Sequence, residues 1–344
     1  MKKPVFFLSV FVLCSFLSFT QAPNSSASDP NKHPELVELF REWREFEKPP
    51  IRDGAPDYTL ATFERRQPEF KALQNRLLAI DTVGWSIADK VDWMIVWAEM
   101  NGYDFNHRVL KPWVRDPAFY KSVYTYKSDV PAHEGPTHHM TTETWTYSFP
   151  LSTAEKKRML ADLSVISPLN AQARMNLTGN ARDLWIAGIR DIKAQVTDLK
   201  NLKEQPKVAK DKKLAEAINK AIVSTQELAD WLEAEASKKT GPSGLGKENY
   251  TWYLQTVHLV PLTWEDEVML LKRELARAWS ALKLEEHRNR DLPLLIDAGT
   301  PEEFEALADR SVKSLIRFLD EQEIVTVKDY FEPALEAQKG SFVP

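Results

Sequence analysis

The sequence predicts an all-α protein, built as a multi-helix array. Apolar residues recur at helical spacing along most of the chain. In several places Ser or Thr stands three residues before an acidic residue, a pattern typical of helix starts. Strand-like alternation is confined to one place, so at most a short extended segment is expected near residues 142–149.

The first three helices are marked by prolines and by a capping serine. Residues 35–48 form an amphipathic run that is bounded by prolines at both ends. A second helix is expected over residues 59–80, where Pro68 should break or kink it. Ser86 can cap a third helix, because its side-chain oxygen can accept a hydrogen bond from a free backbone N–H.

The chain from residue 106 to residue 147 is expected to be irregular, because it contains several prolines. Helices resume after it, and four capping boxes mark helix starts. The boxes are Ser152 with Glu155, Thr263 with Asp266, Thr300 with Glu303, and Thr326 with Asp329. Two more helical regions are expected, from Asn180 to about Leu202 and over residues 207–239.

The N-terminal segment has the order of a secretory signal peptide. Two lysines precede an apolar run over residues 4–20, and polar residues follow. Cleavage after Ala27 would remove residues 1–27, whereas cleavage after Ala22 would leave a proline directly behind the cut and is disfavoured. An uncleaved N-terminal anchor is a further alternative. We therefore expect an exported protein, either periplasmic or secreted.

The composition argues against several classes of binding partner and of catalytic residue. Cys14 is the one cysteine and lies in the signal peptide, so the exported chain would have no disulfide and no cysteine nucleophile. Loss of the two signal lysines changes the formal net charge from −5 to −7, which argues against nucleic acid as a partner and against stable membrane association after cleavage. Residues 28–344 are long enough to form one helical domain with its own core.

One cluster has the residue types of a zinc site and lies in the irregular region. It comprises His133, Glu134, His138 and His139. The zinc-protease helix needs two histidines at i and i+4, but the first two histidines here are at i and i+5, about 140° apart around a helix. A proline and a glycine in the cluster also disfavour a helix. We expect a solvated loop with no metal ligand, and a metal site in this loop is the weaker alternative.

A second candidate site is a groove wall for a peptide-like substrate. It comprises Glu248, Tyr250, Tyr253 and His258. The two tyrosines are at i and i+3 and so share one side of a helix. A tyrosine hydroxyl and a carboxylate could bind a peptide terminus or stabilise an oxyanion. The alternative is that the tyrosines pack in a core with their hydroxyls satisfied.

Other catalytic chemistries lack support, and no residue is assigned a catalytic role. The chain contains no Gly-x-Ser-x-Gly segment for a serine nucleophile. Glu265 with Glu267, and Glu285 with Glu286, are not spaced to share a helix face, so we expect these carboxylates in solvent. The glycine-rich loop at 241–246 lacks the Gly-Lys-Ser/Thr ending of a phosphate loop.

Several stretches together resemble a known bacterial family. The stretches are residues 98–102, 104–108, 176–181, 246–254, 258–263, 273–278 and 325–330. They resemble the family known as the domain of unknown function 885, whose members look like secreted or lipid-anchored helical zinc metallopeptidases. The resemblance extends over nearly the whole chain after the signal peptide.

The resemblance implies an all-helical fold, a peptide-like substrate and a zinc site in full-length members. In the family the zinc motif is a His-Glu pair followed by Pro-Gly-His-His, in the C-terminal half. This chain contains no such motif, so the resemblance covers the N-terminal half and implies no cofactor held by this chain.

Two functions follow as hypotheses. The first is the helical scaffold, and part of the substrate groove, of an exported zinc metallopeptidase-like hydrolase. Such a scaffold would be inactive alone and would need a separate C-terminal half. The alternative is a stand-alone exported helical protein that binds a partner without catalysis.

Overall fold

The computed structural model describes residues 33–126, 140–293, 297–340 and 342. Over these residues the chain is helical apart from strands of two residues each, so the predicted all-α fold is confirmed. The signal peptide lies outside the described residues. The chain divides into two compact units, Met1–Val268 and Met269–Pro344.

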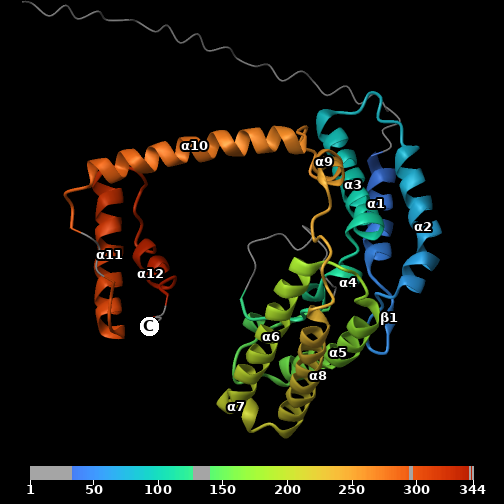
Figure 1. Ribbon diagram of the computed structural model, residues 1–344, viewed down its shortest axis with the longest axis horizontal. Coiled ribbons are helices and arrows are strands. Elements are labelled where there is room, and N and C mark those ends of the chain that lie inside the picture. The colour runs from blue at the N-terminus through green and yellow to red at the C-terminus, as the bar shows by residue number, and fades with distance from the viewer. Residues whose placement is uncertain (1–32, 127–139, 294–296, 341, 343–344) are drawn as a thin grey trace, which may run out of the picture. The chain divides into compact units, whose positions relative to one another are not determined.

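The elements of the first unit follow one another from residue 33 to residue 268 (Figure 1). They are α1 (His33–Glu47), β1 (Ile51–Arg52), β2 (Ala55–Pro56), α2 (Leu60–Leu78), α3 (Ile87–Phe105), the π-helix η1 (Asn106–Leu110), α4 (Pro112–Arg115), the 3-10 helix η2 (Pro117–Tyr120), β3 (Val123–Tyr124), β4 (Thr142–Glu143), the 3-10 helix η3 (Thr144–Thr146), α5 (Thr153–Asn176), α6 (Arg182–Glu204), α7 (Pro206–Ala209), α8 (Lys212–Ala236), α9 (Lys247–Thr256) and the start of α10 (Trp264–Arg288).

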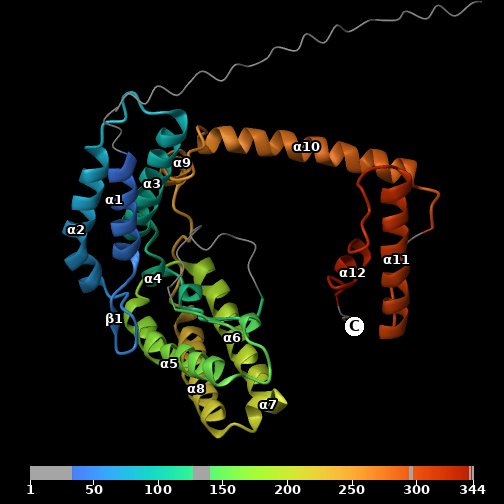
Figure 2. The same ribbon diagram turned by 180° about the vertical axis from the view of Figure 1, so that it is seen from behind.

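Helices α1, α2 and α3 pack side by side through their apolar faces, as the two opposite views agree (Figures 1 and 2). They meet at the buried Trp43 of α1, whose ring centroid lies 5.8 Å from that of Phe70 in α2 and 5.1 Å from that of Tyr103 in α3. Aromatic rings bury much apolar area each, so this cluster supplies much of the packing energy of the three helices.

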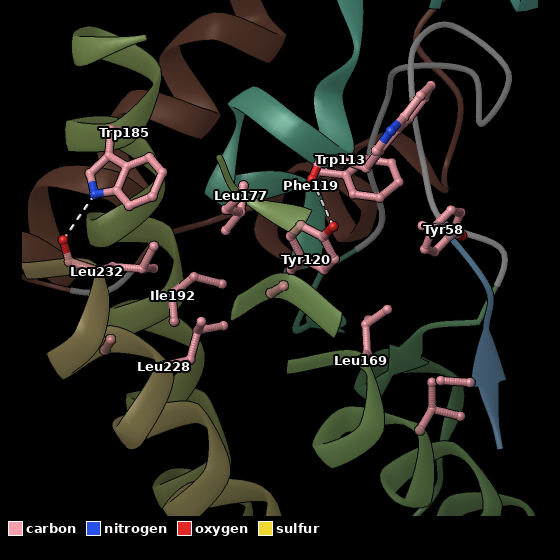
Figure 3. Packing of buried hydrophobic residues seen from close by; sticks show 14 residues of the cluster. Tyr58, Trp113, Phe119, Tyr120, Leu169, Leu177, Trp185, Ile192, Leu228 and Leu232 are labelled. Carbon is pink, nitrogen blue, oxygen red and sulfur yellow. Dashed lines mark hydrogen bonds between the residues drawn. The ribbon is translucent and has the colours of Figure 1, made fainter. Parts of the chain in front are cut away.

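Helices α5, α6 and α8 form a second group with its own buried core (Figure 3). The indole of Trp185 in α6 is fully buried and donates a hydrogen bond of 2.9 Å to the carbonyl of Leu232 in α8. Tyr120 of η2 is also fully buried, and its hydroxyl donates to the carbonyl of Trp113 at 2.8 Å. The indole N–H of Trp185 and the hydroxyl of Tyr120 are therefore both hydrogen-bonded inside the core.

The strands of the described region are minor elements. β1 pairs with β2 in antiparallel register, and β3 pairs with β4 in parallel register. β4 lies at the start of the extended segment expected near residues 142–149. The chain then turns into η3, where the hydroxyl of Thr146 donates to the carbonyl of Glu143 at 2.8 Å. The alternation of aromatic and polar residues here is therefore not that of a strand.

Three of the four predicted capping boxes start helices. Glu155 N–H donates to the hydroxyl of Ser152, and the Glu155 carboxylate accepts from Ser152 N–H, at the start of α5. Thr263 and Asp266 make the same exchange at α10. At α11 (Pro301–Glu321) the N-cap is Thr300, whose hydroxyl accepts from the Glu303 N–H.

One local prediction is wrong, and of the break or kink expected at Pro68 the break does not occur. Thr326 does not start a helix, because α12 (Phe331–Glu336) begins five residues further on. Pro68 lies inside α2 and does not break it. The proline removes one backbone donor, and the carbonyl left without that donor belongs to Glu64. Both residues are exposed, so water can reach this carbonyl.

The second unit contains the rest of α10, together with α11 and α12. The ammonium of Lys339 joins α11 and α12, because it contacts Asp309 at 2.6 Å, Glu305 at 2.8 Å and Glu336 at 2.9 Å. None of the described residues of α10, α11 and α12 is buried. Across the described part of the chain, no helix is long and apolar enough to span a membrane.

Candidate functional site

Helix α9 carries three of the four predicted groove residues, His258 follows its C-terminal end, and aromatic contacts hold the helix against α3. The ring of Trp252 stacks on that of Phe105 with centroids 5.5 Å apart and an interplanar angle of 8°. Leu254 is buried on the same helix. The helix begins after Gly246, which has a φ of 82°, a backbone conformation that glycine adopts without steric cost.

Two of the four predicted groove residues lie in contact. The ring centroid of Tyr253 lies 4.8 Å from that of His258 and 4.8 Å from that of Phe105. Tyr253 is half-buried and His258 is exposed, so one edge of the pair faces solvent. Glu248 is exposed in the first turn of α9, where a negative charge suits the helix dipole.

Tyr250 pairs with Glu267, whose carboxylate was expected from the sequence to lie in solvent. Its hydroxyl donates a hydrogen bond to the carboxylate of Glu267 in α10. This bond raises the pKa of Tyr250 above its ordinary value, because loss of the phenol proton would bring a second negative charge beside Glu267. Glu265 forms an ion pair with Lys247 at 2.9 Å, so both α10 carboxylates are bound to residues of α9.

The second candidate cluster, His133 with Glu134, His138 and His139, lies outside the described residues. Within the described ranges, no group of three or more His, Cys, Asp or Glu side chains is placed to hold a metal ion.

One buried histidine, His107, was not identified from the sequence as a possible site residue. His107 lies in η1, and its Nδ1 lies 2.7 Å from the carbonyl oxygen of Tyr103. Three aromatic rings surround it, with centroids at 3.9 Å for Tyr103, 4.5 Å for Phe63 and 4.9 Å for Trp113. Burial lowers the pKa of His107 to about 4, so the ring is neutral at physiological pH.

The backbone around His107 departs from a regular helix. The chain widens to a π-helix at η1, and Lys111 follows with φ 44° and ψ 55°, in the left-handed region. π-helical turns are found often at functional sites. The proline after Lys111 is the only local mark of this turn, and it does not indicate a π-helix. The π-helix could therefore not be predicted from the sequence.

A charged network ties the same segment to its neighbours. The carboxylate of Asp104 accepts from Lys71 of α2 at 3.1 Å and from Arg108 at 2.9 Å. Burial alone would raise the pKa of Asp104, but these two hydrogen bonds outweigh burial and hold it below its ordinary value. The Arg108 guanidinium lies 5.3 Å from the ring centroid of Trp252, so the network extends to α9.

The glycine-rich loop is fixed to the start of α6. The side-chain oxygen of Asn180 accepts from the N–H groups of Thr240 at 2.7 Å and Gly241 at 2.8 Å. The hydroxyl of Ser243 accepts from the N–H of Asp183 at 2.8 Å and so caps α6 from a distant part of the chain. These hydrogen bonds give the loop a structural role, because they hold it against the start of α6. Asn180 does not begin the helix itself.

Apolar side chains cover both sides of α3. Val96 and Met100 are buried against α1 and α2. Ile87, Val91 and Met94 are exposed, and at 100° per residue they lie on the opposite side of the helix. An exposed apolar stripe on a helix whose other side is packed is a candidate contact surface.

Comparison with known proteins gives one structural likeness. No family model matches the chain, and no curated protein matches it. A solved structure from Shewanella oneidensis, described as a candidate lipoprotein of unknown function, superposes with a TM-score of 0.50 at 16% identity. The superposition covers 86% of this chain and 57% of that chain. At this identity the likeness concerns the helical fold alone.

Proposed function

We propose that residues 28–344 are the helical scaffold of an exported, metallopeptidase-like peptide hydrolase, inactive alone, and that a C-terminal half outside these residues supplies the catalytic site. One observation carries the proposal. The described residues of α10, α11 and α12 include many large apolar side chains, and none of them is buried. Large apolar side chains that are exposed together on a helix often mark a surface that a partner covers.

The exposed stripe of α3 supports the same proposal from within the first unit. Ile87, Val91 and Met94 form a second apolar surface, on a helix whose other side is already packed. Two uncovered surfaces on separate helices suit a chain that is completed by further polypeptide. The reaction class comes from the resemblance to the domain-885 family, in which zinc belongs to the other half.

Within this scaffold, α9 would contribute one wall of the substrate groove. The half-exposed pair of Tyr253 and His258 offers an aromatic edge, and the Tyr250 hydroxyl with Glu267 offers a polar one. An aromatic edge beside a hydrogen-bonding group suits a peptide backbone. No metal ligand is assigned to the chain in this proposal.

Export rests on the N-terminal segment. The lysines, the apolar run and the polar end of residues 1–27 have the order of a cleaved signal. The similar fold of a candidate lipoprotein is compatible with an envelope location.

The proposal is tested on the purified chain with two assays. Elemental analysis after purification without chelator should find less than about a tenth of an equivalent of zinc, because the chain is proposed to lack the ligands. A fluorogenic peptide library should be left uncut with or without added zinc. Zinc-dependent cleavage by this chain alone would refute the scaffold role and direct attention to His133, Glu134, His138 and His139.

A matched pair of valines tests the uncovered surface. Val91→Lys on the exposed stripe should reduce binding of the dye 1-anilinonaphthalene-8-sulfonate and leave the melting temperature nearly unchanged. Val96→Lys, on the buried side of α3, should lower the melting temperature strongly, because it buries an unpaired charge. If Val91→Lys destabilises the fold as much as Val96→Lys does, the stripe is already covered and the proposal loses its support.

The second candidate function is a stand-alone binding protein. It is favoured by the first unit, which contains three buried apolar clusters of its own. A stand-alone protein should be a compact monomer with a sharp cooperative melt and little dye binding. A scaffold should bind the dye strongly and aggregate at high concentration.

A further inference from the structure

One end of the group formed by α5, α6 and α8 carries a concentration of lysines. Helix α6 ends there, the short helix α7 follows, and α8 begins (Figures 1 and 2). Between residues 200 and 213 six lysines stand against two carboxylates, Glu204 and Asp211. The surface formed by the six lysines is here named the basic end: Lys200, Lys203, Lys207, Lys210, Lys212 and Lys213.

The backbone of the basic end is fixed by buried side chains beneath it. Leu202 of α6, Val208 of α7 and Leu214 of α8 are buried in one apolar cluster. The N–H of Val208 donates to the carbonyl of Gln205 at 2.8 Å, and the N–H of Asp211 donates to the carbonyl of Val208 at 2.9 Å. The lysines are therefore gathered on a folded surface, and not on a loose tail.

The positive charges of the basic end are not neutralised by the described residues around them. None of the six lysines forms an ion pair with another described residue, and all are exposed except the half-buried Lys203. Asp211 caps α8 by accepting from the N–H of Leu214 at 3.3 Å, and it pairs with the ammonium of Lys156 in α5. Its charge is thus matched by a lysine outside the six. Glu204 and, one turn into α8, Glu216 remain, so six lysines stand against two carboxylates.

The chain as a whole is acidic, but distance decides which charges an approaching surface meets. The formal net charge of −5 opposes stable membrane association. At physiological ionic strength the Debye length is about 8 Å, so exposed charges beyond that distance are largely screened. A negatively charged surface at the basic end would therefore be attracted by the lysines more than it is repelled by distant carboxylates.

The side chains of this surface favour lipid headgroups over a protein partner. No large apolar side chain is exposed between residues 200 and 213, because Leu202 and Val208 are both buried. Protein–protein contacts normally have an apolar core and few lysines. Lysine also lacks the rigid fork with which arginine holds a single carboxylate. A cluster of about four to eight basic residues instead suits an array of anionic lipid headgroups.

We propose that the basic end binds reversibly to the headgroups of an anionic phospholipid bilayer, by charge and without insertion into the apolar layer. An exported protein of the cell envelope meets such a surface. The inference goes beyond the scaffold role proposed above and does not depend on it.

The first test is co-sedimentation of the purified chain with vesicles of two compositions. One contains phosphatidylglycerol and phosphatidylcholine in equal amounts, and the other contains phosphatidylcholine alone. The chain should sediment with the anionic vesicles only. Raising the salt from about 0.1 M to about 1 M should release it, because the Debye length falls from about 10 Å to about 3 Å. Equal binding to both vesicles, no binding to either, or binding that persists at high salt would overturn the inference.

The second test uses matched double variants. One combines Lys207→Gln with Lys210→Gln on the basic end, and the other combines Lys90→Gln with Lys272→Gln elsewhere. All four lysines are exposed and form no ion pair with a described residue, and both double variants change the net charge equally. The first should weaken binding to anionic vesicles by about tenfold or more, and the second by less than about twofold.

Circular dichroism should show both double variants as helical as the parent, and both keep the same N-terminal segment. Equal weakening by the two would mean that the overall charge of the chain, and not this end, governs binding, and would overturn the inference. The comparison of salts and lipids uses the parent alone and stands whatever the variants do.

Two competitors distinguish other anions. Sodium phosphate that releases the chain from anionic vesicles better than sodium chloride of equal ionic strength would assign the basic end to a free phosphate. Poly-L-glutamate that releases the chain as well as an excess of unlabelled anionic vesicles would assign it to an acidic polypeptide. Either result would overturn the lipid assignment, and release by anionic vesicles but by neither competitor would support it.

Discussion

Nδ1 of His107 lies 2.7 Å from the carbonyl oxygen of Tyr103, one helical turn earlier in the chain. A carbonyl oxygen can only accept, so this nitrogen must carry the proton. With the ring neutral, the other nitrogen, Nε2, has a lone pair, and Nε2 finds no hydrogen-bond partner in the described part of the chain. Protonation of Nε2 would place a positive charge among aromatic rings, near the charges of Arg66 and Asp104.

This contact predicts a pH dependence of stability. Burial lowers the pKa of His107 from 6.5 to about 4 in the folded protein. Between these two values the unfolded chain binds a proton that the folded chain does not, so the free energy of unfolding rises with pH across this window. The contribution is complete above pH 6.5 and is lost as the pH falls towards 4; it amounts to roughly 3 kcal/mol.

Urea unfolding of His107→Phe, followed by tryptophan fluorescence from pH 4 to pH 7, measures this contribution. The variant should show a flatter dependence on pH than the parent. His287→Phe is the control, because solvent reaches the ring of His287 in the folded protein. If His107→Phe keeps the slope of the parent, the ring is not held neutral by burial.

The buried indole of Trp185 should contribute strongly to stability. Trp185→Phe removes the hydrogen bond to the Leu232 carbonyl and leaves a cavity, at a cost of roughly 2 kcal/mol in the free energy of unfolding. Trp279→Phe makes the same substitution at an exposed site and should cost less than about 0.5 kcal/mol. Equal costs in urea unfolding would mean that Trp279 is covered in solution.

Two capping-box motifs of the same form should differ in their effect on stability. Ser152→Ala removes a reciprocal cap at the start of α5 and should cost about 1 kcal/mol. Thr326→Ala changes a motif of the same form that caps no helix, and should cost less than about 0.5 kcal/mol. Thermal melts followed by circular dichroism compare the two, and a larger loss for Thr326→Ala would contradict the described start of α12.

This pair of motifs also illustrates how far the sequence determines the fold. A cap joins atoms three residues apart, so Ser86, Ser152 and Thr263 could be recognised locally, and the helices they start were predicted. Whether such a motif is used depends on the packing of the helix that would follow. The residues after Thr326 form a turn before α12, and no local pattern distinguishes that case.

The candidate site depended on contacts between distant residues. The helix that carries Tyr250 and Tyr253 was predicted from local spacing, but the pairing of Tyr250 with Glu267 joins residues across a loop. The burial of His107 depends on Phe63, which lies 44 positions earlier. Such contacts are set by how helices pack, and a single sequence carries no direct signal for them.

The glycine-rich loop lies very close to Asn180 at Gly241. A Cβ at Gly241 would lie 2.3 Å from the Asn180 backbone oxygen, far inside van der Waals contact, whereas a Cβ at Gly244 would meet no atom within 4 Å. Gly241→Ala must therefore displace the loop and weaken the bonds from Thr240 and Gly241 to Asn180. We expect limited proteolysis to cut Gly241→Ala within residues 240–246 faster than the parent, and Gly244→Ala at the parental rate. Equal cleavage of both variants would show that the loop is not braced against α6.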